Sequence, residues 1–178
     1  MSIEIDIQTG DSSWPRAQPL VMASFPPDAA MILPTGPVQW ANPDLRVFIE
    51  DDEEVVCHVG IYRRIGTWKG RKIRLGGVGG VATHADHRRK GYAGLALTAA
   101  IQTLRDERSI DFAVLVCRPY NEAFYEKRGW HAFGGEMYVE QKSGDKSARV
   151  LFDVMKPYVF DMRYGPRDGV LDLCGLPW

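Results

Sequence analysis

The 178 residues of this chain include 45% hydrophobic and 25% charged side chains, a composition typical of one globular domain that can bury a core. The formal net charge of −1 gives no general attraction to nucleic acids or membrane surfaces. No apolar run reaches the length of a membrane span, and the polar first residues lack a secretory signal. We therefore expect a single cytoplasmic domain over residues 1–178.

The first elements follow from alternating apolar residues and from proline positions. Residues 3–7 alternate as a short strand does, and Ser12 or Ser13 is a candidate N-cap for a helix that runs to about Met22. Five of the eleven prolines lie between residues 25 and 43. Long loops inside compact domains are often functional, so we expect a functional loop there.

Three strands are predicted in the centre of the chain. The apolar runs 45–49 and 55–63 flank an acidic turn at 50–53, and residues 68–70 form the turn into a glycine-rich strand at 75–83. Short connections between successive strands favour antiparallel pairing.

A helix and a buried strand follow. Residues 91–107 carry apolar side chains at helical spacing, and residues 112–117 are apolar at every position. A strand buried on both faces is typical of a parallel arrangement. Together with the glycine-rich strand, these segments predict a strand, a crossover helix and a parallel strand.

The last third of the chain predicts one more helix and a hairpin. The helix covers residues 120–128 and ends at Gly129. Strands at 130–140 and 149–156 are expected to close the sheet as a hairpin across residues 143–145.

A basic segment stands before the central helix. Arg88, Arg89 and Lys90 directly precede Gly91, where the helix begins. A helix start offers free backbone N–H groups and the positive end of the helix dipole. The segment therefore predicts an anion site of the kind that holds a pyrophosphate, although the same residues also fit a solvated turn.

The spacing of Arg88, Gly91 and Ala93 matches the Arg/Gln-x-x-Gly-x-Gly/Ala signature of the GNAT acyltransferases, and the chain resembles that superfamily. The resemblance implies an α/β (α+β) GNAT fold: a mixed, mostly antiparallel central sheet, flanking helices and a parallel β-α-β site for coenzyme A. Acetyl-CoA would be the cosubstrate. Backbone groups of the strand would meet its pantetheine arm and the loop would line its phosphates, which gives these cofactor-binding candidates: Val81, Ala82, Thr83, Arg88, Arg89, Lys90, Gly91, Tyr92, Ala93 and Gly94.

Two neighbouring motifs are missing. The chain has neither the Gly-x-x-x-x-Gly-Lys-Ser/Thr loop nor a Gly-x-Gly-x-x-Gly opening a helix, so nucleoside triphosphates and nicotinamide cofactors are less favoured than coenzyme A. Four glycines at positions 76, 77, 79 and 80 would weaken a strand unless something approaches its backbone closely. A cofactor arm is one such group.

The segment from Asn121 to Trp130 resembles the second GNAT motif, whose tyrosine stands four residues before a glycine and protonates or steers the coenzyme thiolate. By this resemblance Tyr125 is the candidate acid, and packing on the helix face is the alternative. The motif usually has an asparagine where this chain has Arg118. The resemblance therefore does not extend to a coenzyme contact by Asn121.

Three histidines need separate interpretation. His58 lies in a strand beside the glycine-rich one and is a candidate for catalysis or substrate contact, with a backbone-paired core histidine as the alternative. His84 and His87 flank the phosphate loop at a spacing of three but lack the acidic or thiol company of a metal site, so we expect no metal. No residue stands out as general base.

The three cysteines predict neither a disulfide framework nor a zinc site. Cys57, Cys117 and Cys174 are odd in number, widely spaced and outside any Cys-x-x-Cys pair. Cys57 and Cys117 lie in apolar runs and are expected to be buried thiols.

The chain also resembles the aminoglycoside 2′-N-acetyltransferases. The features that carry this resemblance are the third strand with His58 to Arg64, the Tyr-x-x-x-Gly-Trp motif from Tyr125 to Trp130 and the terminal Trp178. This resemblance implies an aminoglycoside-type antibiotic as acceptor and a role in resistance. The tail is apolar enough to dock, yet less acidic than the family pattern, which favours a less cationic drug such as kasugamycin. The candidate substrate contacts are Trp178, Asp172, Trp40 and Gly79.

Other functions stay open. The chain is also compatible with a GNAT enzyme that acts on another small amine or on a protein amine, and with a nodulation-type N-acyltransferase. A non-catalytic coenzyme-binding module or a nucleic-acid binder is a different class, but 23 acidic residues balance the cations and disfavour polyanion binding. We expect no nucleic-acid or membrane partner, and a homodimer is one option for assembly.

Overall fold

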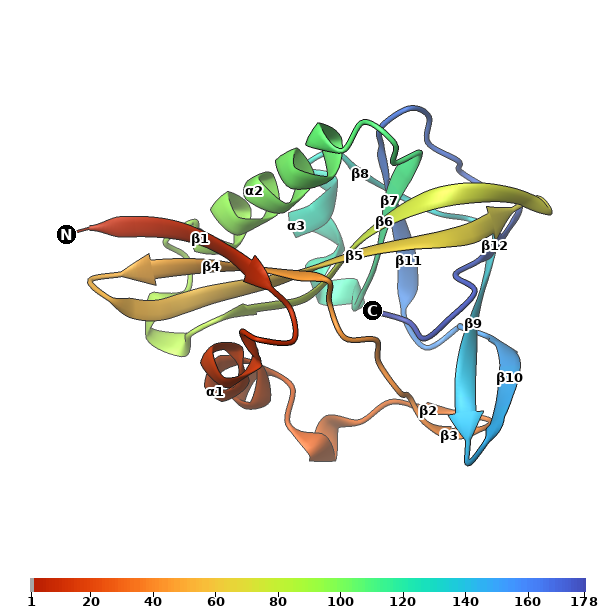
Figure 1. Ribbon diagram of the computed structural model, residues 1–178, viewed down its shortest axis with the longest axis horizontal. Coiled ribbons are helices and arrows are strands. Elements are labelled where there is room, and N and C mark those ends of the chain that lie inside the picture. Colours follow the sequence, from red (N-terminus) through yellow and green to blue (C-terminus); the bar gives the residue numbers. More distant parts are fainter. Residues whose placement is uncertain (1) are drawn as a thin grey trace. The chain divides into compact units, whose positions relative to one another are not determined.

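The computed structural model describes residues 2–178, and the chain divides into two compact units. Strands β5 (Glu54–Trp68) and β6 (Arg71–Thr83), labelled in Figure 1, contribute residues to both units. The expectation of a single domain stays a prediction. The first unit holds residues 2–30, 42–62 and 78–107, and the second holds Met31–Ala41, Arg63–Gly77 and Arg108–Trp178.

The first unit is built from strands and two longer helices. In it β1 pairs antiparallel with β4, and β4 pairs antiparallel with β5, which lies next to β6. The predicted strands at 3–7, 45–49 and 55–63 and the predicted helix at 91–107 are confirmed, with longer strands than expected. The elements that begin here are β1 (Ile3–Thr9), α1 (Trp14–Ser24), the short 3₁₀ helix η1 (Pro27–Ala29), β4 (Leu45–Asp51), the 3₁₀ helix η2 (Ala85–His87) and α2 (Tyr92–Asp106).

Burial explains why these strands and α2 form one layered core. Val47, Phe48 and Ile49 are consecutive in β4 and all are buried, so both faces of the strand are covered. Helix α2 packs against β4 and buries one face. The buried face consists of residues at the spacing of helical turns: Ala96, Leu97, Ala100, Ile101 and Leu104.

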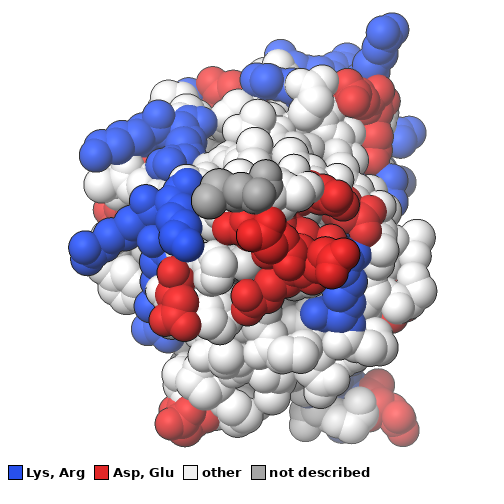
Figure 2. Space-filling view, turned by 90° about the vertical axis from the view of Figure 1, so that its left-hand side faces the viewer, with Lys and Arg blue, Asp and Glu red and all other residues white. Residues whose placement is uncertain are grey.

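The acidic turn between β4 and β5 is strained and exposed. Asp52 and Glu53 have φ angles of 48° and 69°, in the left-handed region that residues other than glycine rarely adopt. Together with Ser2, Glu4 and Glu50 they line a surface pocket. Figure 2 shows acidic side chains gathered into a patch on this face of the molecule.

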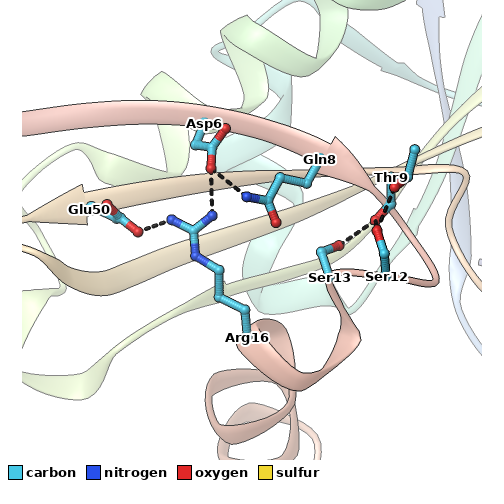
Figure 3. Close-up of polar contacts among 7 residues, drawn as sticks. All are labelled: Asp6, Gln8, Thr9, Ser12, Ser13, Arg16 and Glu50. Atoms are coloured by element: carbon cyan, nitrogen blue, oxygen red, sulfur yellow. Dashed lines mark hydrogen bonds and ion pairs between the residues drawn. The ribbon is translucent and has the colours of Figure 1, made fainter.

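Helix α1 is tied to the strands by charge rather than by its cap. Ser13 is the N-cap but makes no side-chain cap bond, and its hydroxyl donates instead to the Thr9 carbonyl at 2.6 Å. Arg16 donates to Asp6 at 2.6 Å and also pairs with Glu50, so it connects the helix to β1 and β4 (Figure 3). The Arg16 guanidinium holds the pKa of the Asp6 carboxyl below its usual value.

The second unit contains the remaining strands. Its main sheet includes β5 and β6, which both units share, and has the order β10-β9-β12-β5-β6-β7-β11-β8, whereas β2 pairs antiparallel with β3 in a separate two-stranded sheet. Strands β6 and β7 are parallel, with Leu75–Gly77 opposite Phe112–Val114, which confirms the predicted parallel pair. Strands β9 and β12 form a second parallel pair. The elements that begin here are β2 (Ile32–Leu33), β3 (Gly36–Pro37), β7 (Phe112–Cys117), the 3₁₀ helix η3 (Pro119–Asn121), α3 (Glu122–Glu126), β8 (Trp130–Ala132), β9 (Glu136–Ser143), β10 (Lys146–Leu151), β11 (Lys156–Asp161) and β12 (Val170–Asp172).

The prediction of one strand at 130–140 is wrong. The segment forms two strands with different partners, because β8 pairs with β11 whereas β9 pairs with β10 and β12. At the interruption, a Cβ on Gly135 would lie 2.0 Å from the Gly169 carbonyl oxygen, so the two backbones touch there. Only the absence of a side chain permits that approach.

Two further boundaries differ from the sequence-based expectation. The strand predicted at 149–156 is also wrong as a unit, since β10 ends at Leu151 and β11 begins at Lys156. The predicted turn at 143–145 does connect β9 to β10. The helix predicted at 120–128 is the shorter α3 preceded by η3, and Gly129 follows with a φ of 88°.

No helix in residues 2–178 combines the length and the apolar character needed to cross a membrane.

Candidate functional site

The basic segment before α2 lies exposed in a left-handed turn. Arg88, Arg89, Lys90 and Gly91 are all exposed, and Arg89 and Gly91 have φ angles of 65° and 87°. A Cβ at Gly91 would meet nothing within 4 Å. Glycine therefore serves the turn here through its backbone freedom and not through the space it leaves.

The first turn of α2 has no side-chain cap. Gly91 is the N-cap and makes no side-chain cap bond, and the turn contains no acidic residue. The N–H groups of Tyr92, Ala93 and Gly94 lie in this first turn, where helical N–H groups have no partner within the helix. An uncapped helix start beside three cations fits the charge and donor needs of a pyrophosphate.

Two contacts hold this turn to the unit. The buried Tyr92 phenol donates to Asp51 Oδ2 at 2.5 Å, and this bond raises the pKa of the Tyr92 phenol. Arg88 Nε donates to the Thr83 carbonyl at 3.4 Å. The Tyr92 side chain is therefore an anchor for α2, and only its backbone is placed for an anion.

The end of β6 carries the other cofactor-binding candidates. Gly79, Val81 and Thr83 are partly exposed, whereas Ala82 is buried. Gly80 has a φ of 57°, and the His58 ring lies 3.4 Å from where its Cβ would be. This strand end and the start of α2 lie in the same unit.

His58 is a buried, neutral residue that makes two hydrogen bonds. Its side chain is 1% exposed; Nδ1 lies 2.8 Å from the Gly80 carbonyl oxygen and Nε2 lies 3.0 Å from Arg46 Nη1. The carbonyl can only accept and the guanidinium can only donate, so Nδ1 carries the proton and Nε2 accepts. Burial lowers the pKa of His58 to about 4. These contacts match a histidine that positions the β6 backbone.

His84 and His87 have acidic company after all, which corrects the sequence-based interpretation. Ligand atoms of Glu54, His84 and His87 lie within 4.8 Å of one another. His87 Nδ1 also lies 3.7 Å from Asp51 Oδ2. The β4–β5 hairpin brings these carboxylates to the histidines from about thirty positions earlier in the chain, so local sequence could not show them.

In the second unit, Tyr125 is buried in an aromatic group on α3 and β8. Its ring centroid lies 5.1 Å from that of Phe124 and 6.4 Å from that of Trp130, both in edge-on arrangements. The packing alternative therefore describes part of its role. The acid role stays a prediction.

The tail of the second unit is docked, as the apolar sequence predicts. Trp178 is 4% exposed, and its indole N–H donates to the Val114 carbonyl at 2.9 Å. A Cβ on Gly77 would lie 2.2 Å from the indole, so this glycine makes room for Trp178. The Arg64 guanidinium lies over the Trp178 ring, and Arg64 Nη1 donates to the Leu176 carbonyl at 2.8 Å. Both contacts hold the tail in place.

Two other substrate candidates, Asp172 and Trp40, already contact other side chains of the second unit. Asp172 accepts from Arg149 Nε at 2.5 Å and from the Cys174 backbone N–H at 2.8 Å. Trp40 is exposed and packs edge-on against Phe152. Asp172 thus already balances a cation of its own unit.

The cysteine expectations hold for the two buried thiols. Cys57 and Cys117 are free and buried, and Cys174 is free and exposed. Burial raises the pKa of the Cys117 thiol to about 11, which makes it a weak nucleophile near neutral pH.

Comparisons with known proteins bear on the family and the fold of this chain. The sequence profile described as "Acetyltransferase (GNAT) domain" matches residues 39–133, more than half of the chain. A search of curated proteins finds no match.

Solved structures show the same fold at low identity. A GCN5-related N-acetyltransferase from Kribbella flavida is 16% identical with a TM-score of 0.57, over 76% of this chain and 34% of that one. The GNAT family N-acetyltransferase YhbS from Escherichia coli, solved in complex with CoA, is 13% identical with a TM-score of 0.60, over 97% and 89%. FeeM, an N-acyl amino acid synthase from uncultured soil microbes, is 13% identical with a TM-score of 0.58, over 90% and 91%.

These matches confirm the expected fold class, a mixed and mostly antiparallel sheet with flanking helices and a parallel strand pair. The chain spans about a third of the Kribbella flavida protein.

Proposed function

Because the chain belongs to the acetyltransferase (GNAT) domain family, we propose that it transfers an acetyl group from acetyl-CoA to the amine of a small molecule. The observation that carries this proposal is the start of α2. An uncapped helix N-terminus follows three exposed cations in one turn, which is the donor and charge arrangement that a pyrophosphate needs.

The residues of this segment have distinct proposed roles. Backbone N–H groups from Tyr92 to Gly94 bind phosphate oxygens, and Arg88, Arg89 and Lys90 neutralise their charge. Val81, Ala82 and Thr83 offer backbone groups of β6 to the pantetheine arm. His58 holds the Gly80 carbonyl and so fixes the strand that carries those groups.

Bound acetyl-CoA supplies an activated thioester. The amine nitrogen bonds to the acyl carbon and gives up one proton to solvent water, the carbon–sulfur bond breaks, and the departing thiolate takes a proton. We propose Tyr125 as the acid that gives this proton, on the strength of the Tyr-x-x-x-Gly-Trp motif that ends at Trp130.

The proposed acceptor is an aminoglycoside-type antibiotic, with a kasugamycin-like drug as first candidate and resistance as the biological outcome. The support is the sequence outline of His58, Tyr125 and Trp178. The Trp178 indole is buried, and Asp172 forms an ion pair with Arg149. Both observations favour a structural role for Trp178 and Asp172. The acceptor proposal therefore depends on the sequence motifs.

A second candidate acceptor is an amino acid. The structural likeness to FeeM, an N-acyl amino acid synthase, covers 90% of this chain and suggests testing amino acids together with longer acyl groups. Protein amines and polyamines complete the alternatives.

The deciding experiment measures thiol release from acetyl-CoA with a panel of amines: kasugamycin, several aminoglycosides, amino acids, polyamines and a peptide mixture. Turnover on a drug supports the antibiotic acceptor. Turnover only on another amine keeps the acetyltransferase and rejects the drug. No turnover with any amine, at enzyme concentrations that detect slow reactions, argues against the transferase.

The variant Tyr125→Phe belongs in the same assay. Loss of the phenol is expected to lower kcat roughly 10²-fold or more with little change in the affinity for CoA, because the acid acts on the developing thiolate. The matched control is Tyr120→Phe, an exposed tyrosine nearby in the sequence. Equal kcat in Tyr125→Phe and the wild type would leave Tyr125 with a packing role only.

A further inference from the structure

We propose that Glu54, His84 and His87 bind one divalent transition-metal ion of the zinc class. The three side chains lie in the first unit, and the site joins the start of β5 to the 3₁₀ helix η2 that leads into the cofactor loop. Metal binding here is independent of acyl transfer, so its test does not rest on the proposed function.

The donor set is the first support. Within residues 2–178 this is the one group of three histidine, cysteine or carboxylate residues whose ligand atoms all lie within 4.8 Å of one another. Two imidazoles and one carboxylate match the ligands that Zn²⁺ takes at distances of about 2.0–2.2 Å.

The direction of the His87 ring is the second support. Nε2 lies 3.7 Å from Glu54 Oε2, while Nδ1 faces Asp51 Oδ2 at 3.7 Å on the other side of the ring. A metal-bound histidine commonly gives its other ring N–H to a carboxylate, which fixes the ring and strengthens the ligand. Asp51 stands where that outer carboxylate belongs.

Asp51 supplies an independent observation. Its side chain is 10% exposed, and its Oδ1 is buried without a hydrogen-bond partner in the described part of the chain. Its other oxygen accepts from the Tyr92 phenol. A buried carboxylate oxygen without a partner is costly, and a positive centre at His87 would offset that cost.

Two contacts must change when the metal binds. The Asp86 backbone N–H donates to His84 Nδ1 at 3.3 Å, and Lys90 Nζ lies 3.4 Å from His87 Nδ1. A neutral imidazole has one lone pair, so metal on His84 replaces or breaks the Asp86 bond. Both contacts are long, and Lys90 is exposed and can turn away.

The consequence of binding is a link between two segments. Glu54 begins β5, and His84 and His87 flank and end η2 directly before Arg88. Three bonds to one ion would hold this segment in place relative to the β4–β5 hairpin. We therefore expect the ion to stabilise the first unit and to order η2, which directly precedes the basic turn at residues 88–91.

The test is a titration of the metal-free chain of residues 1–178 with Zn²⁺, followed by calorimetry. One equivalent is expected to bind. His87→Ala and Glu54→Gln are each expected to weaken binding at least roughly tenfold. The matched controls are His131→Ala and Glu53→Gln, which remove an exposed histidine and the neighbouring exposed carboxylate and are expected to leave the affinity unchanged.

A measurement on the wild type covers the case in which a variant does not fold. Addition of Co²⁺ should broaden the NMR signals of the His84 and His87 rings and spare the His131 ring. The variant Cys174→Ser should bind equally well, because that exposed thiol is not a ligand. Failure to bind Zn²⁺, equal affinity in His87→Ala, or broadening confined to His131 would each overturn the proposal.

Discussion

The two hydrogen-bond partners of His58 determine its protonation state. Its ring lies between a carbonyl that only accepts and a guanidinium that only donates, so the neutral form with the proton on Nδ1 satisfies both partners. A second proton would have no acceptor at Nε2 and would stand against Arg46. Burial and that nearby cation both disfavour the charged form, and burial is the larger cause.

A pH prediction follows for this residue. The pKa of His58 falls from 6.5 to about 4 on folding. Between pH 6.5 and 4, His58 is therefore protonated in the unfolded chain and neutral in the folded chain. The free energy of unfolding is therefore expected to fall as the pH drops from 6.5 to 4, by up to about 3 kcal/mol from this group. Denaturant unfolding at several pH values measures it.

The matched variant for that experiment is His58→Gln, whose amide can still donate to one partner and accept from the other. Its stability curve should lack the contribution of the histidine, so the gap between the two proteins narrows or reverses toward pH 4. Parallel curves for wild type and variant would contradict the assignment. His131→Gln, a change at an exposed site, controls for loss of a histidine as such.

At the scale of elements, glycines decide which segments can touch. Gly77 in β6 lies under the Trp178 indole, and Gly135 lies against the backbone of Gly169. Both contacts join residues far apart in the sequence. In each case the space of a missing side chain is used by another part of the second unit.

The Gly77 contact gives the element-scale prediction. Gly77→Ala places a Cβ that would lie 2.2 Å from the indole, so it is expected to destabilise the protein by about 1–3 kcal/mol through overpacking. Thermal or denaturant unfolding measures the loss. In the background of Trp178→Leu the same alanine should cost much less, because the clash partner has gone.

The double-mutant cycle makes this prediction sharp. A coupling energy of about 1 kcal/mol or more between positions 77 and 178 is expected for residues in direct contact. Additive losses would mean that the indole does not press on Gly77 in solution, and that the tail is held by other contacts such as those of Arg64.

At the scale of the whole molecule, coenzyme binding should appear as stability. A ligand that binds only the folded chain adds about 2.7 kcal/mol at one hundred times its Kd. For a chain of this length that corresponds to a rise in Tm of roughly 5–10 °C. Differential scanning fluorimetry with increasing CoA measures the shift, and pantetheine, which lacks the phosphates, should produce less.

The basic loop is tested by the same readout. Changing both Arg88 and Arg89 to alanine is expected to remove most of the CoA-dependent shift, because charge-assisted contacts to the phosphates are lost. The matched control changes Arg71 and Lys72, two exposed cations of β6, and should retain the shift. An unchanged shift in the Arg88 and Arg89 variant would reject the phosphate assignment.

The sequence by itself determined the features that depend on local pattern. The apolar runs of β4, β5 and β7, the helical spacing of α2 and the turn at Gly91 are local signals, and so is the order of strand, crossover helix and parallel strand. The cationic turn before α2 is contiguous in the chain, so its motif identified the family before any contact was known. Local pattern also predicted that the thiols of Cys57 and Cys117 are buried.

The tertiary structure alone decided the features that depend on distant partners. Glu54 reaches His84 and His87 through a hairpin, Trp178 fills the space above Gly77, and Arg46 fixes the proton on His58. The split of the 130–140 segment into β8 and β9 also needed the distant β11 and β12 as partners. Side-chain chemistry repeats along the sequence, but which groups meet is set by packing, and packing joins positions that no local pattern connects.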